Sequence, residues 1–346
     1  MFSGFSLSDK GCLIMDNVPP GTEVGIDYHS WYTGTQFKGI SNIPPGFHML
    51  FFSATDKYGN GASRTSYFLF VKKSALLYRK YDKQLEDLID NQSEESNLPS
   101  IEEVAKYLAP YPLEQCAKWP QHTNYINDDL LQRVQPLLKK LDALTEVSLQ
   151  TSAVRKKKVF NLDSRIVHKE CEEGLIRFSK IPDTFPLSTT PAEKTLHCID
   201  STYFLKQFIN SLPKGEDDIL GELQFAFICF LLGQVYDAFD HWKALINLIA
   251  SCQNYLSENH EFFCKFIDIV ERQLEEIPED FFVDIVAQNN FLVKTFKNFF
   301  TNFDNPEQIN NKLLHRASIF KGKIIERFHW DLDYEDEEDL PVVVDI

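Results

Sequence analysis

Two pairs of residues in this sequence have types and a spacing that metal binding or acid–base chemistry would need. His260 and Cys264 would lie one helical turn apart, where they could share a metal ion. Two ligands do not complete a zinc site, so we interpret them as a packed pair. Glu222 and His241 lie in otherwise apolar helices and could act as an acid and a base, but a satisfied buried hydrogen bond explains them better.

Other catalytic motifs are missing as well. The sequence contains no Gly-x-Ser-x-Gly elbow, no Gly-rich phosphate loop before a helix, no Cys-x-x-Cys and no His-Glu-x-x-His. Asp56, close to a Gly-Asn-Gly turn at residues 59–61, lacks the regular acid spacing of a calcium loop. We therefore predict no catalytic residues, no cofactor, no metal site and no small-molecule substrate.

The most apolar stretch, residues 219–249, predicts a buried pair of helices instead of an active site. Every side chain from Phe225 to Leu232 is apolar, so this helix is expected to lie inside a larger helical body. Gly233 is expected to end it in the left-handed conformation, and Asp237 to cap the next helix. We expect four residues of the hairpin to belong to the structural core: Phe225, Phe227, Phe230 and Trp242.

The first part of the chain has a different pattern and is β-rich. Short aromatic or β-branched runs alternate with Pro-Gly and Gly-rich turns, and they predict strands at residues 23–28, 49–54, 67–71 and 76–78. Hairpins between them would build an antiparallel, β-sandwich-like domain. Short helices are expected at residues 101–108 and 128–144.

The later part predicts an all-α domain of about seven helices. Thr190-Pro191-Ala192-Glu193 has the residues of a helix-capping box. Residues 305–308 have the same pattern, with Asn in place of Thr and Gln in place of Glu, and predict a second helix start. Further helices are expected at residues 262–274, 278–286 and 291–303. The predicted class is α+β in two domains, with a β-rich domain at 1–152, a linker at 153–172, a helical domain at 173–328 and a tail at 329–346.

Composition limits the possible partners and compartments. The formal net charge of −16 argues against binding the phosphate backbone of nucleic acid and suits a basic protein partner. Seven irregularly spaced cysteines indicate free thiols in a reducing compartment. We expect neither a secretory signal nor a membrane span. The basic run at residues 155–158 could be a nuclear import signal or an RNA contact, although such runs in linkers are usually just solvated.

The C-terminal tail combines a dense acidic run with a β-prone end. Seven acids lie between residues 331 and 339, and their repulsion is expected to keep the free segment extended. The valines that follow favour a strand, which needs an existing sheet edge to pair with. From the residues alone, a disordered tail and a tail docked on the chain's own sheet both remain open.

Several stretches together resemble the Aar-two family of splicing factors, from about residue 13 to the C-terminus. The resemblance rests on these segments: Gly25–Tyr28, Phe37–Ile40, Ile43–His48, Pro110–Pro112, Lys118–Trp119, Ile176–Ser179, Thr190–Glu193, Leu220–Phe227, Phe230–Gly233, His241–Lys243 and Ile277–Val286.

The resemblance implies a β-sandwich-like N-terminal domain, a helical C-terminal domain similar to the VHS superhelix, and no enzymatic activity. It implies an assembly chaperone of the U5 small nuclear ribonucleoprotein in the cytoplasm and nucleus. Its partner would be the large splicing-factor-eight scaffold protein, held through RNase H-like, endonuclease-like and Jab/MPN-like domains, so that the RNA helicase and RNA do not bind too early. The family's tail is a partner-binding element, which assigns strand addition to Val342, Val343 and Val344, together with Trp330.

Two other classes of function remain as alternatives. A VHS-type cargo or peptide adaptor would need a basic groove between helices, and Lys and Arg are sparse in residues 190–303. A hydrolase with an unrecognised site in the β-domain would need a cleft with two or more titratable residues of shifted pKa.

Overall fold

The structure is a computed structural model of the chain. It describes residues 9–53, 64–90, 101–142, 173–185, 189–278, 291–304 and 309–332. Contacts divide the chain into two compact units: Met1–Ser179 with Gln224–Phe239, and Lys180–Leu223 with Asp240–Ile346. The first unit thus includes part of the apolar hairpin, and the domain limits drawn from the sequence remain a prediction.

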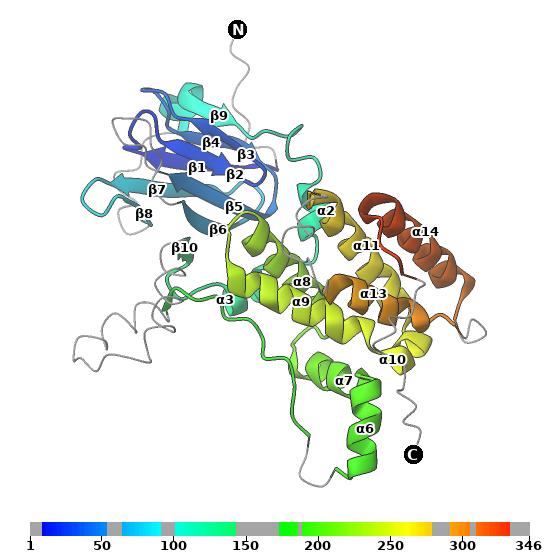
Figure 1. The fold of residues 1–346 in the computed structure, drawn as a ribbon. Coiled ribbons are helices and arrows are strands. Elements are labelled where there is room, and N and C mark those ends of the chain that lie inside the picture. The colour runs from blue at the N-terminus through cyan, green and yellow to red at the C-terminus, as the bar shows by residue number, and fades with distance from the viewer. Residues whose placement is uncertain are drawn as a thin grey trace, which may run out of the picture. The chain divides into compact units, whose positions relative to one another are not determined.

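The first unit is built on two five-stranded sheets, drawn in blue and cyan in Figure 1. One sheet has the order β8-β7-β1-β4-β9, with strands Asp87–Ile89, Leu76–Asp82, Gly11–Asp16, Gly39–Ile43 and Leu108–Pro110. The other has the order β10-β6-β5-β2-β3, with strands Lys140–Asp142, Thr65–Val71, Gly46–Ser53, Glu23–Ile26 and His29–Tyr32.

Most of the strand pairs are antiparallel, as the turn-rich sequence predicts. Two pairs in the first sheet are parallel, β1 with β7 and β4 with β9. Side chains join the two sheets: Phe52 of β5 packs edge-on against Tyr81 of β7 with ring centroids 6.1 Å apart, and the Tyr67 hydroxyl donates to Asp87. Together with the helical part described below, these sheets confirm the predicted α+β class.

The pairing of β4 with β1 requires a glycine at the start of β4. Gly39 starts β4 with φ 134°, a backbone conformation that side-chain-bearing residues rarely adopt. A Cβ atom there would lie 2.0 Å from the Leu13 carbonyl oxygen of the neighbouring strand. Only glycine therefore allows β4 to approach β1 this closely.

The short helices of the first unit differ from the prediction in length. The expected helix at 101–108 divides into α1 (Ile101–Val104), the 3₁₀ turn η2 (Ala105–Tyr107) and strand β9. A small helix, α2, spans Trp119–Thr123.

The helix predicted at residues 128–144 is wrong in its second half. Helix α3 spans Asp128–Val134, with the Asn127 side chain capping the Leu130 N–H, and strand β10 follows. Gln135 is extended, with ψ 152°, because the ring of the next residue, Pro136, disfavours helical backbone before it. The proline outweighed the helical spacing of the leucines.

The helical part runs from green to red in Figure 1. Its described helices are α6 (Pro191–Ile199), α7 (Thr202–Ser211), α8 (Glu216–Leu231), α9 (Tyr236–Ala250), α10 (Gln253–Glu258), α11 (His260–Glu276), α13 (Phe291–Thr301) and α14 (Asn311–Phe328). The predicted capping box of Thr190 and Glu193 is confirmed. The Asn310 side chain caps α14, whereas the predicted cap at 305–308 and most of the predicted helix at 278–286 lie outside the described residues.

The turn between α8 and α9 corrects two details of the predicted hairpin. Gln234, not Gly233, has the left-handed conformation, with φ 56° and its N–H donating to the Phe230 carbonyl. Gly233 is needed for space, because a Cβ atom would lie 2.6 Å from the Cys229 carbonyl oxygen. Asp237 lies in the first turn of α9 and does not precede it as a cap.

Candidate functional site

The predicted partner-binding residues lie at or beyond the end of α14. Three of them fall outside the described residues: Val342, Val343 and Val344. The fourth, Trp330, is half-buried and stacks on Phe328 and Phe296, with ring centroids 4.8 and 6.3 Å apart. Leu332, two residues further on, is also buried. The first residues of the tail therefore pack on α13 and α14.

The chain changes direction where this packing begins. His329 ends α14 in the left-handed conformation, with φ 55°, and its N–H donates to the Ile325 carbonyl at 3.0 Å. This turn directs Trp330 back onto the two helices. A deletion meant to test the tail alone must therefore begin after Leu332.

The four residues predicted to form a structural core differ in their burial. Three are fully buried: Phe225, Phe227 and Trp242. Phe230 is half-buried and stacks on Phe239 at 4.5 Å, so the apolar end of α8 is not wholly shielded from solvent.

Phe225 lies among three other aromatic rings. Its ring centroid lies 5.0 Å from that of Phe68, 5.9 Å from that of Phe47 and 6.2 Å from that of Phe178. These neighbours belong to strands β6 and β5 and to the segment after β10, all in the first unit. A side chain enclosed in this way stabilises the fold and has no surface to offer a partner.

The pair considered as acid and base is a buried hydrogen bond. His241 Nε2 lies 3.3 Å from Glu222 Oε2, and the Glu222 side chain is fully buried. Next to it in sequence, Trp242 donates its indole N–H to Gln273 of α11 at 2.8 Å. Both contacts join helices of the bundle, which agrees with the structural interpretation of these residues.

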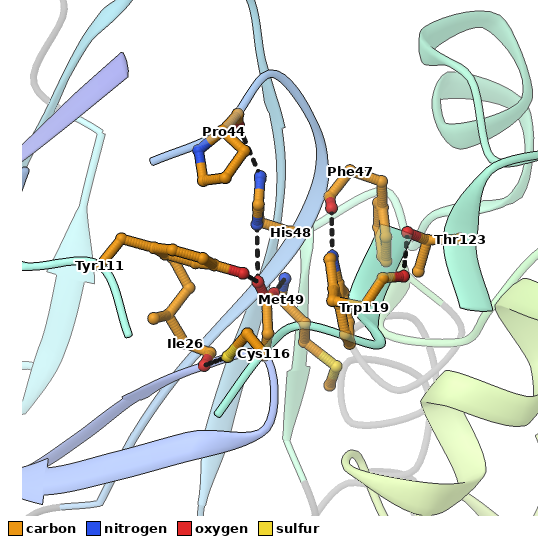
Figure 2. Close-up of polar contacts among 10 residues, drawn as sticks. Ile26, Pro44, Phe47, His48, Met49, Tyr111, Cys116, Trp119 and Thr123 are labelled. Atoms are coloured by element: carbon orange, nitrogen blue, oxygen red, sulfur yellow. Dashed lines mark hydrogen bonds and ion pairs between the residues drawn. The ribbon is translucent and has the colours of Figure 1, made fainter. Parts of the chain in front are cut away.

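A polar cluster that the sequence did not predict lies in the first unit, centred on Asp27 (Figure 2). The Asp27 cluster consists of Asp27, His48, Tyr111, Cys116 and Trp119, all at most 5% exposed. Asp27 accepts hydrogen bonds from His48 Nδ1 at 2.7 Å, from the Tyr111 hydroxyl at 2.5 Å and from the Met49 N–H at 2.9 Å. Its carboxylate therefore joins the end of β2 to β5 and to the segment after β9.

The hydrogen bonds of His48 occupy both of its ring nitrogens. Its Nε2 lies 2.7 Å from the Pro44 carbonyl oxygen, which can only accept, so this nitrogen carries a proton. Its Nδ1 faces the Asp27 carboxylate, which already accepts from two other donors. Both ring nitrogens of His48 therefore have a hydrogen-bond partner, and His48 and Asp27 form a buried hydrogen-bonded pair.

The remaining members of the Asp27 cluster are held equally firmly. The Trp119 indole N–H donates to the Phe47 carbonyl at 2.6 Å, and the ring stacks on that of His48. The Cys116 thiol donates to the Ile26 carbonyl at 3.8 Å. The end of the loop that leads into α2 is thus tied to the sheet, as Figure 2 shows.

The phenol and the thiol of the Asp27 cluster have the protonation states expected of structural residues. Burial raises the pKa of Tyr111, and the adjacent Asp27 carboxylate raises it further. Burial also raises the pKa of the Cys116 thiol, although a backbone hydrogen bond opposes the change. The thiol and the phenol stay protonated, and both nitrogens of His48 are occupied. The cluster thus contains titratable residues of shifted pKa, as the hydrolase alternative requires. It offers a substrate no free base or nucleophile.

The sequence did contain a signal for the Asp27 cluster. Four of the segments that carry the family resemblance supply all of its members except Cys116: Gly25–Tyr28, Ile43–His48, Pro110–Pro112 and Lys118–Trp119. The members are separated along the chain by up to 92 residues, as for Asp27 and Trp119. Only the folded sheet brings them together.

The surface shared by α11 and α14 is strongly charged. Arg316 pairs with Asp268 at 2.6 Å and with Glu271 at 2.7 Å, and Lys323 pairs with Glu271 at 2.5 Å. Burial raises the pKa of Glu271, but the hydrogen bonds from Arg316 and Lys323 outweigh it and hold the pKa below its ordinary value. These pairs fix α14 on α11.

A small cavity between α11 and α14 does not provide the groove that a peptide adaptor needs. Its volume is about 30 Å³, room for about one water molecule. Acidic Glu271 and Glu275 line it together with basic Lys323 and Arg327. It is too small for a peptide and is not uniformly basic.

The described part of the chain gives little evidence of a metal site or of a reactive cysteine. No group of three or more His, Cys, Asp or Glu side chains there could hold a metal ion, and His260 and Cys264 form no part of one. Five described cysteines are free and buried: Cys12, Cys116, Cys229, Cys252 and Cys264. Burial raises the pKa of each thiol, which disfavours the reactive thiolate. No described helix is long and apolar enough to cross a membrane.

Comparison with known proteins gives matches over nearly the whole chain. Residues 9–136 match the AAR2 N-terminal domain, and residues 178–333 match the AAR2 C-terminal repeat region. The chain is 36% identical to the human protein AAR2 homolog, over 96% of this chain and 93% of the human one. It is 30% identical to the protein AAR2 homolog of Caenorhabditis elegans, over 93% and 94%. It is 22% identical to the A1 cistron-splicing factor AAR2 of Saccharomyces cerevisiae, over 95% and 96%.

Proposed function

Because the chain belongs to the AAR2 family, we propose that it acts in pre-mRNA splicing as an assembly chaperone of the U5 small nuclear ribonucleoprotein. It would bind the large scaffold protein of that particle through the RNase H-like, endonuclease-like and Jab/MPN-like domains of the scaffold. While bound, it would keep the RNA helicase and RNA away until assembly is complete. It would work in the cytoplasm and the nucleus.

One observation carries the proposal. The match extends over nearly the full length of a yeast protein whose name is that of a splicing factor. The yeast relative is named as a splicing factor, and the human relative's name is not that of an enzyme. The polar residues of the Asp27 cluster are used in holding the fold together. Function in this chain therefore depends on surfaces.

The tail is the surface element that we expect to contribute most. A short β-prone segment gains stability only by pairing with an existing sheet edge, and an acidic run before it favours encounter with a basic partner. Trp330 and Leu332 fix the point where this tail leaves the folded chain. We propose that Val342, Val343 and Val344 add a strand to the scaffold and that Trp330 anchors the tail.

Removal of residues 333–346 is expected to weaken binding to the scaffold at least tenfold, or about 1.4 kcal/mol. The cut spares Trp330 and Leu332, so the melting temperature of the chain should not change. Isothermal titration of the scaffold's C-terminal domains into both chains measures the difference.

A matched pair of point variants separates strand addition from charge. Val343→Pro removes a backbone donor and should weaken binding like the deletion, whereas Val343→Ile keeps the β propensity and should bind like wild type. Equal affinity of Val343→Pro and Val343→Ile would contradict strand addition.

A further inference from the structure

Helices α13 and α14 carry a positive charge that contrasts with the rest of the chain. Residues 291–304 and 309–328 hold seven Lys and Arg against two Asp and Glu, a net charge of +5, in a chain of net charge −16. We call this the basic surface, and it consists of Lys294, Lys297, Lys312, Arg316, Lys321, Lys323 and Arg327. Five of the seven lie beyond residue 303.

The two helices present this charge from one packed layer. Phe320 of α14 packs against Phe296 and Phe300 of α13, with ring centroids 5.5 and 6.1 Å apart. Lys294 and Lys312 are exposed. The basic surface is therefore held in place by a rigid aromatic core.

Part of this charge is not neutralised by the neighbouring helix α11. Arg327 donates to the backbone carbonyls of Glu275 and Ile277, at 3.2 and 3.0 Å, and these carry no full negative charge. Its buried Nε has no hydrogen-bond acceptor among the described residues. The rest of the Arg327 side chain is only half-buried, so its guanidinium can take a further anionic neighbour.

The chain itself leads an acidic segment to this position. After the turn at His329, Trp330 stacks on Phe296 of α13, and Leu332 is buried. The seven residues that follow, 333–339, include six Asp and Glu. Fully extended they span at most about 25 Å, which exceeds the roughly 16 Å length of α13.

We propose that, in the free protein, the acidic segment 333–339 lies on the basic surface of its own chain. Single exposed ion pairs contribute little, roughly 0–1 kcal/mol each, but several act together here. A short tether also raises the local concentration of the segment to about the millimolar range. The contact is electrostatic and is weakened by salt.

The intramolecular contact would add a regulatory step to scaffold binding. This consequence rests on the proposed function. A partner that takes up the tail must first displace its acidic part from α13 and α14. The scaffold's own basic surface could do this by competing for the same carboxylates. The contact itself concerns the free chain and is tested without any partner.

Zero-length carbodiimide coupling of the full-length chain tests the proposal, because it joins a lysine amine only to a carboxylate in contact with it. We expect monomeric chain to yield links from the acidic segment to Lys294, Lys297, Lys312 or Lys321, identified by mass spectrometry. Lys72 and Lys73, whose side chains are 75% and 73% exposed in the first unit, serve as matched lysines that should not react with the tail. High salt should abolish the expected links.

Three other results would overturn the proposal. Links spread equally over Lys72, Lys73 and the basic surface would mean that the tail has no preferred site. Links found only between chains of different isotope labelling would assign the surface to a second copy. Binding of a U-rich oligonucleotide that is equally tight with and without residues 333–346 would mean that the tail does not cover the surface. Any of these three results would overturn the intramolecular contact alone and would leave the scaffold-binding test unaffected.

Discussion

Phe225→Ala is expected to lower the free energy of unfolding by about 3–5 kcal/mol, the usual cost of truncating a buried phenylalanine. The ring is fully buried and contacts Phe47, Phe68 and Phe178, so its removal leaves a cavity lined by aromatic side chains. Urea unfolding of the full chain, followed by circular dichroism, measures the change.

Phe230→Ala is the matched control for this prediction. The same atoms are removed from the same helix, but Phe230 is half-buried, and the loss of stability should be clearly smaller. A Phe225→Ala chain that unfolds like wild type while losing partner binding would place Phe225 at an interface instead of in the core.

Asp27→Asn is expected to destabilise the chain by about 3–5 kcal/mol, because it breaks a buried pair that is fully hydrogen-bonded. The carboxylate accepts from His48, Tyr111 and the Met49 N–H. An amide offers only one acceptor oxygen and directs N–H groups at these donors. Asn tolerates the left-handed backbone of Asp27, φ 55°, so the variant tests the charge and not the backbone strain.

Asp16→Asn provides the comparison for the Asp27 variant. Asp16 also pairs with a cation, Lys38 at 2.7 Å, but both side chains are partly exposed. The same substitution there should cost less than about 1 kcal/mol. Equal losses at Asp27 and Asp16, measured by urea unfolding, would show that the buried pair is not a main contributor to stability.

Local sequence signals predicted much of the helical part correctly. The capping box at Thr190 and the apolar spacing of α11 and α13 are properties of a few adjacent residues, and the structure places helices at those positions. The errors arose where a second local rule was overlooked. Pro136 ended α3 early, and Gly233 was needed for space and not for its left-handed backbone.

The Asp27 cluster could not be predicted from local patterns. Asp27 falls inside the strand predicted at 23–28, His48 just before the strand predicted at 49–54, and Tyr111 between two prolines. Their roles depend on the register that places β5 beside β2 and on the parallel pairing of β9 with β4. The family resemblance marked these segments, but only the fold explains why they belong together.

The positive charge of α13 and α14 was obscured by the overall composition. A net charge of −16 describes the whole chain, whereas the cations lie on two helices near its end. The charge of a folded surface depends on which helices pack together. The net charge of the whole chain does not reveal it.

The central claim is that this chain binds the U5 scaffold protein, and size-exclusion chromatography tests it most directly. The full-length chain is mixed with recombinant scaffold fragment carrying the RNase H-like, endonuclease-like and Jab/MPN-like domains. We expect one stable complex that elutes ahead of both components and contains both. Separate elution of the two folded proteins, even at low salt where acidic and basic surfaces attract most strongly, would contradict the proposed function.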